Sequence, residues 1–102
     1  MTNAKAPLSP VELLARTIRE LEEDYNGLLR EVDYSLVTAA TNRLNGASFV
    51  AKDYEDRAQR FAEHAAYVAH RIVIMRAEYE ERLRLQRETK EDEHAECEVD
   101  RP

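Results

Sequence analysis

The sequence predicts an all-α protein, in the form of a long antiparallel hairpin of two helices packed like a coiled coil. No proline lies between Pro10 and Pro102, and only Gly27 and Gly46 interrupt that span with residues that weaken helices. Apolar residues at alternating steps of three and four run on both sides of Gly46, which is the spacing of a helical seam. With 102 residues the chain has room for one small domain and hardly for two.

The first helix is expected over about residues 10–44. Ser9 suits the N-cap, because its hydroxyl oxygen can accept a hydrogen bond from the Glu12 amide while the Glu12 carboxylate reaches back to the Ser9 amide. Pro10 suits the first helical position, where no amide hydrogen is needed. This motif therefore predicts a well-defined start for the helix.

The apolar stripe of the first helix is unbroken over its first two thirds. It consists of Val11, Leu14, Ile18, Leu21, Tyr25, Leu28 and Val32. Further along, polar Ser35 and Asn42 take the core positions of the repeat. We therefore expect the stripe to drift through Leu36 and Ala39 or Ala40 toward Leu44, and the seam to loosen there.

A turn is predicted at residues 45–47, and a second helix over about residues 48–90. Gly46 suits the left-handed position after a helix end. Ser48 suits the next N-cap, with Asp53 as the alternative if Phe49 and Val50 belong to the turn. The stripe of the second helix consists of Tyr54, Ala58, Phe61, Ala65, Val68, Ile72, Met75 and Tyr79. Polar Arg82 and Gln86 take the next two places, so this seam is expected to end near residue 80.

Charged residues beside the two stripes predict how the helices pair. We label the heptad positions a to g, with Val11 and Ala58 at a. Antiparallel coiled coils place e opposite e and g opposite g, and a fold at Gly46 brings together residues whose numbers sum to about 95. This register pairs acid with base at Glu31–His64, Asp24–Arg71 and Glu22–Arg76.

Acidic side chains are concentrated at the C-terminal end of the chain. Residues 88–102 hold 2 basic and 7 acidic side chains, although the whole chain has a net charge of only -6. Such a segment buries too little apolar surface to offset the entropy lost on ordering. We therefore expect a flexible N-terminus over 1–8, a helical hairpin over 9–90 and a mobile acidic tail over 91–102. The tail either solubilises the protein or attracts a basic partner.

More apolar residues are present than one seam can bury. They include Leu13, Leu29, Tyr34, Leu36, Val37, Leu44, Phe49, Val50, Tyr67, Val73, Ile74, Leu83 and Leu85. A second apolar face on a helix needs a partner, and the simplest partner is another copy of the chain. We therefore expect self-association into a four-helix bundle or a larger assembly. The predicted contact residues are Tyr34, Val37, Tyr67, Val73 and Ile74.

No motif for chemistry stands out, so we expect neither an enzyme nor a bound cofactor or metal. The spacing His94-Ala95-Glu96-Cys97 is half of a zinc site, and a structural zinc needs four ligands. Cys97 lies in an acidic segment, which raises the pKa of a thiol and makes it a poor nucleophile. Nucleic acid is not an expected partner, because the arginines of the second helix are interspersed with glutamates.

The remaining features concern location and topology. No apolar run approaches the roughly 18 residues of a membrane helix, and no signal peptide is recognised. With the single cysteine, this favours the cytoplasm. The topology is similar to that of small secreted helical-hairpin proteins with a Trp-x-Gly turn. However, Leu44 takes the place of their tryptophan, so the sequence is not assigned to that family.

Three functional hypotheses follow. The first is a non-enzymatic interaction or assembly module that binds through the apolar faces of the hairpin. The second is a small inhibitor or adaptor that docks one specific protein with help from the acidic tail. The third is a metal or carboxylate enzyme that is assembled only in the oligomer.

Overall fold

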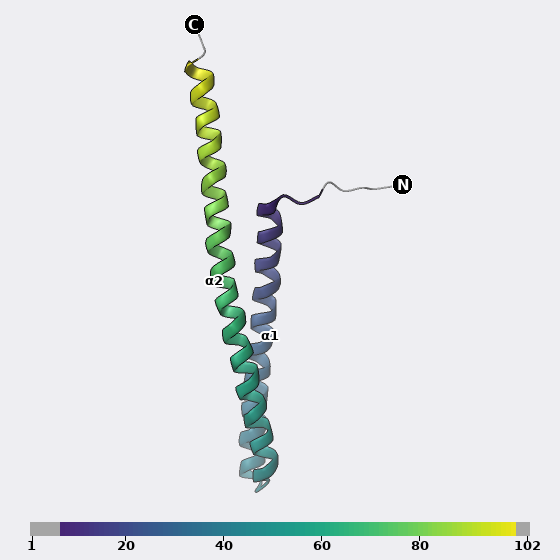
Figure 1. Ribbon diagram of the computed structural model, residues 1–102. Coiled ribbons are helices and arrows are strands. Elements are labelled where there is room, and N and C mark those ends of the chain that lie inside the picture. Colours follow the sequence, from purple (N-terminus) through teal and green to yellow (C-terminus); the bar gives the residue numbers. More distant parts are fainter. Residues whose placement is uncertain (1–6, 100–102) are drawn as a thin grey trace, which may run out of the picture.

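The computed structural model describes residues 7–99, with side chains up to Lys90, and it consists of two helices joined by a tight turn. Helix α1 spans Pro10–Leu44 and helix α2 spans Ser48–Val99. They run antiparallel and pack side by side as an extended hairpin (Figure 1). The all-α hairpin predicted from the sequence is therefore confirmed.

The start of α1 has the predicted capping box. The Glu12 amide donates to the Ser9 hydroxyl oxygen over 3.1 Å, and the Ser9 amide donates to the Glu12 carboxylate over 2.8 Å. Pro10 occupies the first helical position. Two of the amides that a helix start leaves without a partner are thus satisfied within four residues of chain.

The turn after α1 closes on Gly46. Its φ angle of 82° lies in the left-handed region, which glycine adopts without strain. The Gly46 amide donates to the Arg43 carbonyl over 3.1 Å, and the Ala47 amide donates to the Asn42 carbonyl over 2.8 Å. These two bonds form a Schellman motif. The sequence suggested Ser48 as the N-cap of α2. Instead the Ala51 amide donates to the Ala47 carbonyl over 3.0 Å, so the first hydrogen bond of α2 begins at Ala47.

The buried seam of α1 differs from the prediction in the third nearest the turn. Every residue of the predicted stripe up to Val32 is buried or half-buried. Beyond it the repeat continues without drift, because Ser35 and Ala39 are buried whereas Leu36 and Leu44 are exposed. The position of a residue relative to α2, rather than its hydrophobicity, therefore decides what is buried there.

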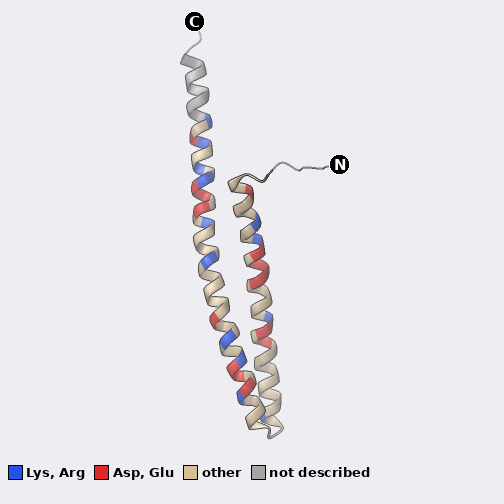
Figure 2. Ribbon diagram, turned by 45° about the vertical axis from the view of Figure 1, so that its right-hand side comes forward, with Lys and Arg blue, Asp and Glu red and all other residues tan. Residues whose placement is uncertain are grey.

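Small residues from both helices make the seam narrow near the turn. On α2 the buried residues nearest the turn are Ala51, Ala58 and Ala65, and on α1 they are Ser35 and Ala39. Bulkier buried residues, namely Ile18, Val68 and Ile72, lie further from the turn. The two ribbons accordingly lie closest near the turn and further apart toward the open end (Figures 1 and 2).

Two ion pairs between the helices establish the register. Arg76 pairs with Glu22, as predicted, and Arg43 pairs with Glu55 over 2.7 Å. In both pairs the residue numbers sum to 98, close to the predicted value of about 95. Of the other predicted pairs, Glu31–His64 and Asp24–Arg71, neither forms an ion pair among residues 7–90, where side chains are described.

Helix α2 continues to Val99, nine residues past its predicted end. No glycine or proline follows Gly46 until Pro102, so the sequence offers no stop signal there. Because α1 begins only at Pro10, the end of α2 extends beyond it (Figure 1). The side chains of the predicted acidic tail over 91–102 lie outside the described residues, and so does its predicted mobility.

Candidate interaction surface

One broad side of the hairpin is apolar and exposed. We call it the apolar face, and it consists of exposed Leu29, Leu36, Ala62, Ala66 and Val73 together with half-buried Ala69. Four of these residues occupy e positions, and the register places Leu29 level with Ala69, and Leu36 level with Ala62. Two helices thus contribute to one continuous surface, with leucines on α1 and alanines on α2.

Each end of the apolar face is marked by an ion pair between the helices. Glu22 and Arg76 lie at the end toward the open side of the hairpin, and Arg43 and Glu55 lie at the end toward the turn. All four residues occupy e positions, in line with the leucines and alanines between them. The face is therefore an apolar surface with charged ends, a composition typical of protein–protein contacts.

A shallow hollow of about 460 Å³ lies at the open end of this face. Its lining residues are Glu22, Tyr25, Asn26, Ala69, Ile72, Val73 and Arg76. Tyr25 and Ile72 belong to the seam, so the floor of the hollow is the core itself. An aliphatic side chain from a partner has room there to contact both helices.

The opposite side of the hairpin is polar and aromatic. A second hollow of about 460 Å³ is lined there by Glu31, Tyr34, Ser35, Tyr54, Arg57, Arg60, Phe61 and His64. The rings of Tyr34 and Tyr54 meet edge to face with centroids 6.5 Å apart, and the Arg57 guanidinium lies 4.9 Å from the Tyr54 centroid. Tyrosine and arginine side chains present both apolar and polar atoms, and such side chains are common at protein interfaces.

The five predicted contact residues are all exposed, but they do not form one patch. Val73 belongs to the apolar face, whereas Tyr34 borders the polar hollow on the other side. Tyr67 lies with its ring centroid 6.0 Å from the Arg71 guanidinium, and Ile74 follows it two helical turns later. All five are exposed, as the sequence indicated, while the alignment of Leu29 and Leu36 with the alanines of α2 emerges only from the register.

The tip of the hairpin exposes two large apolar side chains. Leu44 and Phe49 flank the turn and remain 88% and 89% exposed, the highest values among the exposed large apolar residues. Neighbouring Val50 is also exposed. Residues 34–42 leading to this tip contain no charged side chain (Figure 2). An apolar tip at the end of a long rod is a second candidate contact point.

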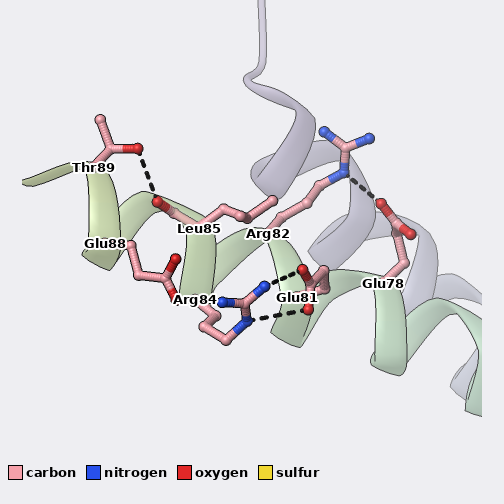
Figure 3. A network of polar contacts seen from close by, with 7 residues as sticks. All are labelled: Glu78, Glu81, Arg82, Arg84, Leu85, Glu88 and Thr89. Atoms are coloured by element: carbon pink, nitrogen blue, oxygen red, sulfur yellow. Dashed lines mark hydrogen bonds and ion pairs between the residues drawn. The ribbon is translucent and has the colours of Figure 1, made fainter.

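Near the far end of α2, where only Tyr79 and Leu83 are half-buried among residues 78–90, ion pairs form within the helix. Glu78 accepts from Arg82 over 2.8 Å, and Arg84 pairs with both Glu81 and Glu88 (Figure 3). These partners lie three or four residues apart, so they stabilise a helix that has little tertiary support. Donation from Arg84 holds the pKa of the Glu81 carboxyl below its ordinary value of 4.5, and the same contact raises the pKa of Arg84.

The ion pair between Arg84 and Glu81 leads to a prediction about pH. Because the pKa of Glu81 is lower in the folded chain, its contribution to helix stability is complete above pH about 4.5 and is lost as the pH falls through the folded value. Helicity around residues 78–89 should therefore decline in acid before the seam unfolds. Carboxyl titration by NMR checks this, with Arg84→Gln expected to raise the pKa of Glu81. An unchanged pKa in that variant would contradict the pairing.

Within residues 7–90 no group of three or more histidine, cysteine, aspartate or glutamate side chains is placed to hold a metal ion. In the described part of the chain neither helix contains a stretch that is long and apolar enough to cross a membrane.

Comparison of the chain with protein-family models, curated proteins and solved structures returned no match.

Proposed function

We propose that this protein is a non-enzymatic interaction and assembly module that binds through the exposed apolar surfaces of its hairpin. The observation that carries the proposal is the apolar face, which spans both helices between two ion pairs. The helices form a seam with little enclosed space, and the hollows are open surface grooves. A rigid rod with apolar sides is suited to binding other helices.

Binding of partners to the immobilised full-length chain tests this proposal. The wild type is compared with Leu36→Asp on the apolar face and with Thr41→Asp as the control, because Thr41 is an exposed polar residue of α1 at a c position, outside that face. We expect proteins bound at stoichiometric amounts, whether foreign proteins or further copies of the chain, to be lost with Leu36→Asp and kept with Thr41→Asp. Equal binding by all three proteins would refute a role for this face.

The exposed tip favours a second candidate, a small inhibitor or adaptor that docks one specific protein. Leu44 and Phe49 would enter an apolar pocket of that protein, as exposed anchors do at many interfaces. The double substitution Leu44→Ser with Phe49→Ser should then release the foreign protein and leave contacts of the apolar face intact. Deletion of residues 88–102 separately tests whether the acidic segment accelerates association, since such an effect weakens with salt.

A further inference from the structure

The charges and side-chain sizes along the apolar face are self-complementary. Between the two ion pairs, the e positions of α1 are Glu22, Leu29, Leu36 and Arg43, and those of α2 are Glu55, Ala62, Ala69 and Arg76. Each helix therefore has the order acid, apolar, apolar, base. The two rows differ in that the apolar places hold leucine on α1 and alanine on α2.

We infer that the apolar face binds a second copy of this chain, and that the two hairpins lie face to face with their turns at the same end. This inference rests on the proposed function, for which it names the partner and the geometry. A two-fold axis along the hairpin lays α1 of each copy over α2 of the other. The result is a four-helix bundle in which all neighbouring helices are antiparallel.

This arrangement matches charges and sizes at each e position. Glu22 of one copy meets Arg76 of the other, and Arg43 meets Glu55. Between these ends, leucine meets alanine twice, so large side chains fill the space that small ones leave. The hollow lined by Ala69 and Val73 lies where Leu29 of the second copy would sit.

The other possible dimer, in which the turns of the two copies lie at opposite ends, is disfavoured by Asp33. It would lay α1 over α1, and the e positions would still pair acid with base. However, it would also bring exposed Asp33, at a b position beside the face, against its own copy near the axis. With turns at the same end Asp33 lies level with Ala66 of the second copy, and Arg19 lies level with Glu80. Only that arrangement avoids facing like charges.

The area is sufficient for a specific dimer. From Glu22 to Arg43 the face is about 32 Å long at 1.5 Å per residue, and two adjacent helices are about 20 Å wide. Each copy would thus contribute on the order of 600 Å², and the pair about 1,200 Å². This total falls at the lower end of the range for stable protein–protein interfaces, roughly 1,200–2,000 Å².

Sedimentation equilibrium of the full-length chain tests whether a dimer forms through this face. We expect a dimer whose dissociation constant rises at least about tenfold with Leu36→Asp. The matched control is Val37→Asp, because Val37 is an adjacent, exposed aliphatic residue at an f position, outside the e and b rows that form the face. Circular dichroism confirms that both variants remain helical. A wild type that stays monomeric at high concentration, or equal effects of the two variants, would overturn the inference.

A charge swap distinguishes the two orientations. The double variant Glu22→Arg with Arg76→Glu keeps opposite charges within each hairpin. It also keeps them between copies when the turns lie at the same end, so we expect an unchanged dimer. With the turns at opposite ends the swapped residues would face Arg43 and Glu55 of like sign, and the dimer would weaken. Weakening would therefore overturn the proposed orientation.

A distance between the two tips provides an independent check. Spin labels at Asn45→Cys, with Cys97→Ser to leave one thiol, should lie within about 20 Å of each other, the width of two helices. Turns at opposite ends would place them about 40 Å apart, and that result would refute the orientation. A monomer whose apolar face holds a foreign protein would refute the second copy as partner, while the proposed function would stand.

Discussion

Truncation of Ile72 to alanine is expected to destabilise the hairpin by about 2–4 kcal/mol. Ile72 is 7% exposed and lies in the seam where it widens toward the open end. Removing its branched side chain takes apolar contacts from α1 and leaves a cavity that two helices cannot readily close. A thin hairpin has few other buried side chains of that size, so a loss of this magnitude is a large fraction of a typical folding free energy.

Ile74→Ala is the matched control for this truncation. Ile74 is the same residue type on the same helix, but it is 54% exposed. We expect its truncation to change the unfolding free energy by less than about 1 kcal/mol, since a surface residue loses little burial. Urea unfolding followed by circular dichroism, at one fixed protein concentration, compares the two variants. Similar losses from both would mean that the seam has been assigned to the wrong face of α2.

The local features of this fold are predictable because their partners are near in sequence. The capping box joins Ser9 to Glu12, and the Schellman motif is completed within six residues around Gly46. Residue type at one or two positions determines such motifs, because the hydrogen bonds involved are those that every helix end must satisfy. Both features were predicted, and both form.

The seam near the turn was harder to predict, because hydrophobicity and position disagree there. From the larger apolar residues we expected the stripe to drift through Leu36 toward Leu44, although both leucines also counted among the surplus apolar residues. In the structure the strict repeat prevails, so that Ser35 and Ala39 are buried and the leucines are exposed. Small side chains at these positions allow the two helices to approach closely. A hydrophobicity scale does not contain this effect of side-chain size.

The candidate site was predicted only in part for a related reason. Leu29, Leu36 and Val73 were recognised as apolar residues without a place in the seam, but the sequence alone did not group them. Their grouping depends on a register that two ion pairs between the helices define. The signal that could have found the face is the e row of each helix, where charged ends enclose two apolar places.

Replacing Ala58 with leucine is expected to destabilise the hairpin, although leucine is a better helix former than most residues and a common core residue of coiled coils. Ala58 is buried in the narrow part of the seam, as is Ala39 on α1. The extra three carbons have no space unless the helices separate, and overpacking of this kind costs about 1–3 kcal/mol.

Two control variants distinguish size from other effects of this substitution. Ala77→Leu adds the same side chain at an exposed position of α2, where a change within about 0.5 kcal/mol is expected. Ala58→Ser adds one polar atom with little volume, and buried Ser35 shows that the seam accommodates a serine. Thermal unfolding should therefore rank Ala58→Leu well below both controls. If Ala58→Leu instead raises the melting temperature, the helices near the turn are not held at close distance, and the burial of small residues there has another cause.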